Sequence, residues 1–245
     1  MPYARLANSY FRFKHFTIEQ DRCAMKVCTD ACVLGATAEL AEASRILDIG
    51  TGTGLLALMA AQRNPTALIE AVELEPEAAE QARANAGRSP WPDRVRIHPL
   101  SLADYAATLP LPFDHILCNP PFFRASLRSP DAARTTARHT AADTLSFGEL
   151  AGFAAQFLTA AGKLTVLLPP PEMQHFEREA ARAGLYPEAR LVVCHRPGSK
   201  PLRHISRFSR QAKTAQQCTL PMHEATSEAY TPEFRALLQD FYLAF

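Results

Sequence analysis

The chain has 245 residues, which is enough for one sizeable α/β domain without a second core. Apolar residues make up 47% and charged residues 21%, as in an ordinary soluble globular protein. The formal net charge of +1 excludes a protein that coats nucleic acid non-specifically. No apolar run suits a signal peptide or a membrane span, so we expect a cytoplasmic protein, a monomer, with no membrane partner.

The six cysteines contain no C-x-x-C pair. Cys28 and Cys32 are four residues apart, but no nearby histidine or second cysteine pair completes a zinc site. We therefore interpret the cysteines as reduced structural thiols and expect no metal.

The N-terminal residues 1–30 are predicted to form an arm, and residues 31–245 the core of the same single domain. Alternation of Phe11 and Phe13 favours a strand or the edge of a hairpin within the arm. Thr29 and Asp30 suit a helix cap before a helix predicted over residues 31–43.

Short apolar runs then alternate with helical patterns along the chain. Strands are predicted at residues 45–49, 68–72, 94–99, 115–118 and 163–169. Helices are predicted at residues 55–63, 77–86 and 147–158, with another after Pro171. This alternation favours a doubly wound, mostly parallel sheet. Residues 191–195 and 205–211 flank a Pro/Gly/Lys turn, which predicts a C-terminal antiparallel hairpin at the sheet edge.

A glycine-rich turn follows the first predicted strand. Asp48 ends that strand, and Gly50, Gly52 and Gly54 follow with the spacing G-x-G-x-G. This spacing is not the G-x-G-x-x-G of dinucleotide-binding folds, and it suits S-adenosylmethionine better than a pyrophosphate. Glu73 ends the next strand about twenty residues later, where a carboxylate accepts hydrogen bonds from ribose hydroxyls.

The tetrapeptide Asn119-Pro120-Pro121-Phe122 follows the strand predicted at residues 115–118. Two prolines remove backbone N–H groups and fix φ, and they hold Asn119 extended. The Asn119 side-chain oxygen and the Pro120 carbonyl are then two acceptors beside the flat face of Phe122. Such a group fits a planar conjugated NH₂, as in adenine. On this tetrapeptide alone, a proline-rich loop closed by a core aromatic is an equal alternative.

Basic residues are unevenly distributed. Residues 123–142 contain one acidic residue, Asp131, and four basic residues: Arg124, Arg128, Arg134 and Arg138. Residues 182–213 contain eight lysines and arginines and one acidic residue. A solvated face is the usual explanation of such runs, and neutralisation of phosphates is the alternative.

Together these motifs resemble those of class I amino-methyltransferases. The segments at residues 13–16, 23–30, 89–91, 137–140, 228–230 and 241–243 are similar to the bacterial tRNA (adenine-N6)-methyltransferase family that acts on a valine tRNA. The resemblance spans essentially the whole chain. It implies a seven-stranded sheet of the class I methyltransferase (Rossmann-like) fold. It also implies S-adenosylmethionine as the methyl donor and tRNA as the partner, with methylation of the adenosine 3′ of the anticodon.

The resemblance also implies roles for individual residues. The expected catalytic residues are Asn119, Pro120 and Phe122. The expected cofactor-binding residues are Lys26, Thr29, Asp30, Asp48, Gly50, Gly52, Gly54, Glu73, Ser101 and Asn119. The expected substrate-binding residues are Lys14, Phe16, Pro121, Phe123, Arg124, Arg138 and His139. The chain departs from the family pattern at Cys28, where glycine is usual, and at Ser101, where an acidic residue is frequent.

Three alternatives remain at this point. A methyltransferase acting on a protein glutamine would also use the Asn-Pro-Pro-aromatic motif, but only about 45 residues precede the glycine strand, too few for a helical docking domain. A DNA adenine methyltransferase would need a target-recognition domain, which is not evident. A non-catalytic RNA-binding module with a relict cofactor pocket is supported only by Cys28 and Ser101.

Overall fold

A computed structural model describes residues 8–23, 25–120 and 145–245. The strands are β1 (Tyr10–Arg12), β2 (Thr17–Glu19), β3 (Arg45–Ile49), β4 (Leu68–Val72), β5 (Val95–His98), β6 (Phe113–Cys118), β7 (Leu158–Leu168), β8 (Tyr186–Cys194), β9 (Pro201–Ser209) and β10 (Gln216–Pro221). The helices are α1 (Thr29–Thr37), α2 (Leu55–Arg63), α3 (Pro76–Arg88), α4 (Leu102–Ala107), α6 (Phe147–Phe157), α7 (Pro170–Arg182) and α8 (Pro232–Leu238). None of these described helices is long and apolar enough to cross a membrane.

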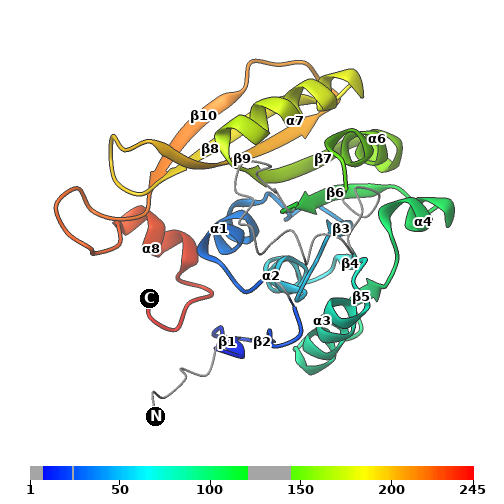
Figure 1. Cartoon of the computed structure of the whole chain (residues 1–245), viewed down its shortest axis with the longest axis horizontal. Coiled ribbons are helices and arrows are strands. Elements are labelled where there is room, and N and C mark those ends of the chain that lie inside the picture. Colours follow the sequence, from blue (N-terminus) through cyan, green and yellow to red (C-terminus); the bar gives the residue numbers. More distant parts are fainter. Residues whose placement is uncertain (1–7, 24, 121–144) are drawn as a thin grey trace, which may run out of the picture.

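Eight strands of the described chain form the main sheet, in the order β10-β8-β9-β7-β6-β3-β4-β5 (Figure 1). β9 is antiparallel to β7 and β8, and the other pairs are parallel. The predicted fold class and the β8–β9 hairpin are therefore confirmed. The predicted count of seven strands and the edge position of the hairpin are wrong, because β10 pairs with β8 and covers it.

Helices cover both faces of the sheet. Figure 1 shows α1, α2 and α3 on one side and α4, α6 and α7 on the other. Each side has its own core, because successive side chains of a strand point to opposite faces: Ile46 of β3 belongs to the first core and Leu47 to the second. This double cover explains why the central strands are almost entirely apolar.

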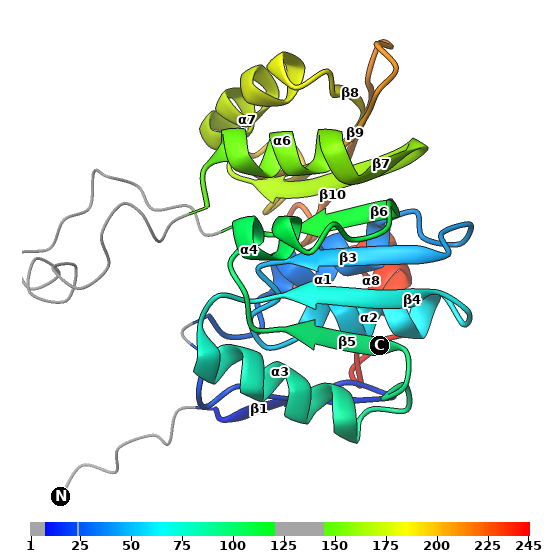
Figure 2. The same ribbon diagram turned by 90° about the vertical axis from the view of Figure 1, so that its right-hand side faces the viewer.

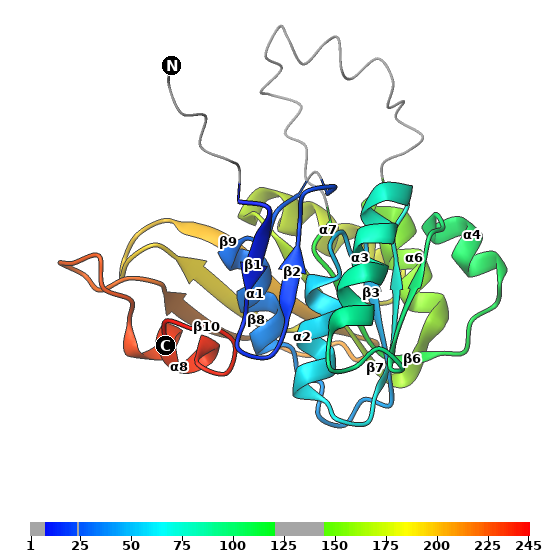
Figure 3. The same ribbon diagram turned by 90° about the horizontal axis from the view of Figure 1, so that it is seen from below.

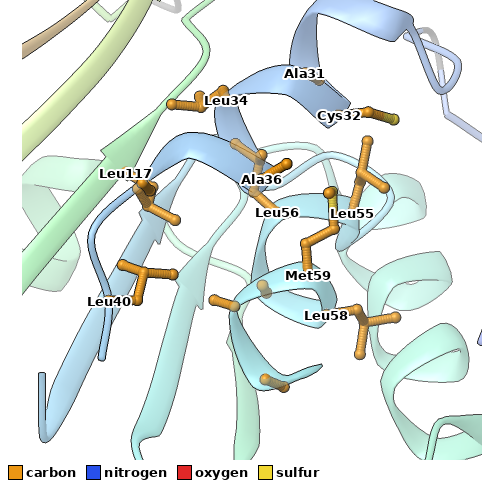
Figure 4. Packing of buried hydrophobic residues seen from close by; sticks show 14 of the residues in the cluster. Ala31, Cys32, Leu34, Ala36, Leu40, Leu55, Leu56, Leu58, Met59 and Leu117 are labelled. Carbon is orange, nitrogen blue, oxygen red and sulfur yellow. The ribbon is translucent and has the colours of Figure 1, made fainter. Parts of the chain in front are cut away.

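Helices α1 and α2 pack closely in the first core (Figure 4). A Cβ atom on Gly35 of α1 would lie 2.5 Å from the Met59 sulfur, so the glycine leaves room for that buried side chain. Helix α1 begins at Thr29 and ends at Thr37, which corrects the predicted cap and the predicted end at residue 43. The chain leaves the helix there because Ala38 is extended and the Asn64 amide takes the carbonyls of Leu40 and Ala43.

The arm forms a separate antiparallel hairpin of β1 and β2, which Figure 3 shows apart from the main sheet. Its aromatic side chains pack against the C-terminal segment: Phe13 pairs with Tyr242 through a backbone bridge, and their rings lie 6.0 Å apart. The backbone N–H of Lys14 donates to the Phe241 carbonyl over 2.8 Å. The two ends of the described chain therefore stabilise each other.

Candidate active site

The site residues on the sheet lie where neighbouring parallel strands end. Ile49 of β3 is paired with Val72 of β4 and with Cys118 of β6. Figure 2 shows the arrowheads of β3, β4 and β5 pointing to the same side. The residues that follow these strands therefore share one edge of the sheet, which is where open α/β sheets bind ligands.

The glycine loop after β3 has a conformation that requires glycine. The φ angles of Gly50, Gly52 and Gly54 are 70°, 55° and 86°. A Cβ on Gly50 would meet no atom within 4 Å, so its backbone faces open space. The N–H groups of Gly50 and Thr51 donate to the Val72 carbonyl over 2.9 and 3.1 Å. The loop is thus fastened to the end of β4 with its backbone open to a ligand.

Glu73 holds the same loop from the side. One carboxylate oxygen accepts from the Gly52 N–H at 2.8 Å, and the other accepts from the Glu75 N–H at 3.0 Å. The side chain is half-buried, and a carboxylate with two hydrogen bonds can accept more. Glu73 therefore connects the loop to the end of β4, where the sequence predicts it.

Asp48 is fully buried beneath the loop. Its Oδ2 accepts from the Thr51 hydroxyl at 2.5 Å, whereas Oδ1 has no hydrogen-bond partner in the described parts of the chain. Burial raises the pKa of Asp48 to about 7, although the Thr51 hydrogen bond acts in the opposite direction. Asp48 thus keeps one buried oxygen, Oδ1, for which the described residues supply no hydrogen-bond donor within bonding geometry.

Asn119 follows β6 at the same edge and is half-buried. Its Oδ1 is buried and lacks a hydrogen-bond partner within residues 8–23, 25–120 and 145–245. Pro120 is buried beside it and has no N–H to donate. The other predicted residues of this region, Pro121, Phe122, Phe123, Arg124, Arg138 and His139, lie outside the described residues.

The two positions that depart from the family pattern are both N-caps. Ser101, which follows β5, caps α4: its hydroxyl donates to the Asp104 carboxylate at 2.7 Å and accepts from the Asp104 N–H at 3.0 Å. Cys28 precedes α1 without a side-chain cap bond. Ser101 is therefore at the shared edge of the sheet, with Asp104 held directly against it.

Lys26, Thr29 and Asp30 all have partners within the chain. The Lys26 ammonium donates to the Asn8 carbonyl at 3.1 Å, and Asp30 forms an ion pair with the Arg203 guanidinium of β9 at 2.9 Å. Thr29 shares a side-chain hydrogen bond with Tyr242. The structure thus places these three expected cofactor residues on the arm and on α1, where they hold other segments.

Lys14 and Phe16, both expected to bind substrate, have contacts within the protein. Phe16 is only 5% exposed and is stacked on Phe13 with ring centroids 4.5 Å apart. The Lys14 ammonium donates to the carbonyls of Phe245, at 2.9 Å, and Gln239. The arm turns both side chains toward the C-terminal segment and the core, and their expected roles toward the substrate stay predictions.

Several arginines of the predicted basic run form ion pairs within the chain. Arg190 pairs with Glu177, and Arg207 pairs with both Glu39 and Glu188. Ion pairs within the chain thus use part of this positive charge, which argues against a continuous phosphate-binding stripe over residues 182–213. No group of three or more His, Cys, Asp or Glu side chains within the described ranges could hold a metal.

Two contributors to the site were missed from the sequence. Thr51 orients Asp48, and Asn85 of α3 bonds to the glycine loop. Asn85 lies on the same face of α3 as Ala78 and Ala82, which are buried. An asparagine among the alanines on the buried face of an amphipathic helix was the sequence signal that could have identified Asn85.

Comparison with known proteins also points to a methyltransferase. Residues 28–170 match a family model described as methyltransferase small domain. A tRNA1(Val) (adenine(37)-N6)-methyltransferase of Dyadobacter fermentans is 42% identical over 97% of this chain and 99% of its own. This chain belongs to that methyltransferase family. A second member, from Trichodesmium erythraeum and of the same name, is 42% identical over 98% of this chain and 100% of its own.

Solved structures of other proteins have a similar fold. A predicted O-methyltransferase of Agrobacterium tumefaciens superposes with a TM-score of 0.63. The superposition covers 86% of this chain and 96% of the other, at 23% identity. This likeness supports the class I methyltransferase fold and nothing finer.

Proposed function

We propose that this protein transfers a methyl group from S-adenosylmethionine to the N6 amine of an adenosine in tRNA, the adenosine 3′ of the anticodon of a valine tRNA. The names of the full-length relatives support the substrate. The observation that carries the chemistry is the buried Oδ1 of Asn119, which has no hydrogen-bond partner among the described residues and lies next along the sheet edge from the glycine loop. A buried acceptor without a donor is costly, and a substrate amine is a donor.

The residues at the edge of the sheet fit the cofactor. Asp48 Oδ1 is a buried acceptor without a partner among the described residues, and Gly50 has open space where a side chain would lie. Asp48 and the glycines would hold the methionine end, Glu73 the ribose hydroxyls, and Ser101 the adenine. Lys26, Thr29 and Asp30 would contribute only after giving up part of their present contacts. When bound, S-adenosylmethionine supplies a methyl group already activated for attack.

The chain's own residues would then act on the amine. The lone pair of an adenine N6 amine is delocalised into the ring, which makes it a weak nucleophile. Hydrogen bonds from its two N–H groups to Asn119 Oδ1 and the Pro120 carbonyl favour a more tetrahedral nitrogen and direct its lone pair. This is positioning with electrostatic stabilisation, and it needs no strong general base. The nitrogen becomes cationic and acidic on methylation, so it releases its proton afterwards.

Recognition of the base belongs to the same proposal. An adenosine in an anticodon loop can leave its stack and enter a protein pocket. Phe122 is proposed as the stacking plane, with Pro121, Phe123, Arg124, Arg138 and His139 around the RNA. Lys14 and Phe16 are left out of this set, because they hold the arm against the C-terminal segment and the core.

The test is transfer of labelled methyl from S-adenosylmethionine to an unmodified valine tRNA. A transcript with guanosine in place of the adenosine beside the anticodon is the matched control. We expect label on the first transcript and none on the second. Label on neither, with binding of S-adenosylhomocysteine intact, would reject the tRNA substrate and direct attention to protein glutamine, DNA adenine or a non-catalytic role.

A further inference from the structure

Asn85, a buried residue of α3, contacts both the arm and the glycine loop. Its side chain is 1% exposed. The Nδ2 group donates to the Glu19 carbonyl and to the Thr53 carbonyl, each at 2.9 Å, and Oδ1 accepts from the Glu19 N–H at 3.0 Å. One amide therefore uses both donors and its acceptor to join two segments that are distant in sequence.

The Thr53 carbonyl lies between two glycines whose conformations form the cofactor loop. Gly52 and Gly54 have φ angles of 55° and 86°, and a Cβ on Gly54 would lie 3.5 Å from Ala82, one turn before Asn85 in α3. Glycines have wide conformational freedom, so a loop built on them needs external anchors to hold one shape. Asn85 is such an anchor, in addition to Val72 and Glu73.

The arm follows α3 up to this loop. Gln81, one turn before Asn85 and also buried, accepts from the Arg22 N–H at 3.1 Å and donates to Asp21. Further along the arm, the Cys23 sulfur lies 3.5 Å from where a Cβ on Gly52 would be. Residues 19–23 thus lie along α3 and reach the glycine loop, with Asn85 at the start of this contact.

We propose that Asn85 is a positioning residue that makes the arm part of the cofactor site. Docking of the arm and binding of S-adenosylmethionine or S-adenosylhomocysteine then support each other, because both require the same placement of the loop. Coupling of this kind is reciprocal. The inference rests on the cofactor part of the proposed function and not on the tRNA substrate.

Asn64 provides a matched control. It is also a buried asparagine, 0% exposed, and its Nδ2 donates to the carbonyls of Leu40 and Ala43 at 2.7 and 2.8 Å. Its Oδ1 accepts from the N–H groups of Thr66 and Ala67 at 2.9 and 2.7 Å. Asn64 precedes β4 and therefore lies at the opposite edge of the sheet from the glycine loop.

The first experiment is calorimetric titration of S-adenosylhomocysteine into wild type, Asn85→Ala, Asn85→Asp and Asn64→Ala. Asn85→Ala is expected to raise the Kd at least about tenfold, which corresponds to about 1.4 kcal/mol. Asn85→Asp should act in the same direction, because a carboxylate keeps the acceptor and loses both donors. Asn64→Ala should bind as wild type does. With tRNA, Asn85→Ala should raise the KM for S-adenosylmethionine and leave kcat at saturation close to wild type.

An unchanged Kd in folded Asn85→Ala, or an equal loss of affinity in Asn64→Ala, would overturn the inference. A second measurement needs no variant: hydrogen exchange of residues 10–19 in wild type, with and without saturating S-adenosylhomocysteine. We expect slower exchange in this segment and no change in residues 64–67. Unaltered exchange in residues 10–19 would also overturn it. Failure of the tRNA assay with these results intact would reject only the tRNA substrate.

Discussion

Asp48 and Asn119 each carry a buried oxygen that no described residue satisfies. Such oxygens lower the stability of the protein alone, since their hydrogen bonds to water are lost without replacement. Both side chains lie at the same edge of the sheet, directly below or beside the glycine loop. We therefore expect these two oxygens to lower the stability of the protein without ligand and to bind donors of the ligands.

Asn119→Ala should slow methyl transfer strongly and leave cofactor binding nearly intact. The side chain is proposed to contact the amine and to matter most as positive charge develops on nitrogen, so kcat should fall by about 10²–10³. Single-turnover rates and the Kd of S-adenosylhomocysteine measure the two effects separately. Equal rates for wild type and Asn119→Ala would remove Asn119 from the catalytic role.

Asp48→Asn should make the empty protein more stable at alkaline pH. The folded-state pKa of Asp48 is raised to about 7 by burial, so the folded state binds more protons than the unfolded state between roughly pH 4 and 7. Wild type therefore loses free energy of unfolding as pH rises through that window, and the asparagine variant lacks this loss. The variant's advantage should grow on the order of 3 kcal/mol from pH 4 to pH 8.

Denaturant unfolding at both pH values checks this, together with S-adenosylhomocysteine binding, which should weaken in Asp48→Asn. The same pH dependence in wild type and variant would show that Asp48 ionises as an exposed carboxylate does.

Among the elements, β6 and β7 share a buried polar link in an otherwise apolar pair. The His115 ring is bonded to the Thr165 hydroxyl over 2.8 Å. Burial, assisted by the nearby positive charge of Arg207, lowers the pKa of His115 to about 3. The His115 ring is therefore neutral in the folded protein at ordinary pH.

His115→Gln should make the protein more resistant to acid. A histidine with a depressed folded pKa contributes stability above its unfolded pKa of about 6.5, and this contribution is lost as pH falls toward 3. Glutamine can keep a hydrogen bond to Thr165 and does not titrate. Between pH 7 and pH 4 the variant should lose less free energy of unfolding than wild type, by on the order of 3 kcal/mol. His175→Gln, at an exposed position on α7, is the control and should follow wild type.

The elements that the sequence predicts well are those with local signals. β3, α2 and β4 have the predicted bounds because each is a compact apolar run, and the glycine loop is bounded by a strand end and the start of a helix. β10 was missed because Gln216–Thr219 are exposed and carry no apolar alternation. The site residues differ in the same way. Asp48, Glu73 and Asn119 lie at or just after the ends of strands, which local patterns predict. The Asp30–Arg203 ion pair joins segments far apart in sequence, which no local pattern predicts.

In the whole molecule, the last residues are structural. Phe241 is buried, and Tyr242 packs against both Phe11 and Phe13 of the arm. The arm in turn reaches the glycine loop through Asn85. Contacts therefore run without interruption from the C-terminal segment to the candidate cofactor site.

Removal of residues 241–245 should release the arm. Loss of the buried Phe241 and the packed Tyr242 should lower the free energy of unfolding by about 3–5 kcal/mol. Limited proteolysis should then cut within residues 8–23 faster in the truncated protein than in the full chain. Leu243→Ala changes an exposed side chain of the same segment and should alter neither property. An equally protected arm in the truncated protein would show that α3 alone holds it.

The junction between Lys14 and the terminal Phe245 has a consequence for synthesis in the cell. The arm is translated long before its partners, because Lys14 bonds to the carbonyl of Phe245 and Phe13 pairs with Tyr242. Sheet and helices can assemble while translation proceeds. The arm can take its final place only after residues 242–245 have left the ribosome, so a chain that stops before them lacks the contacts that hold the arm.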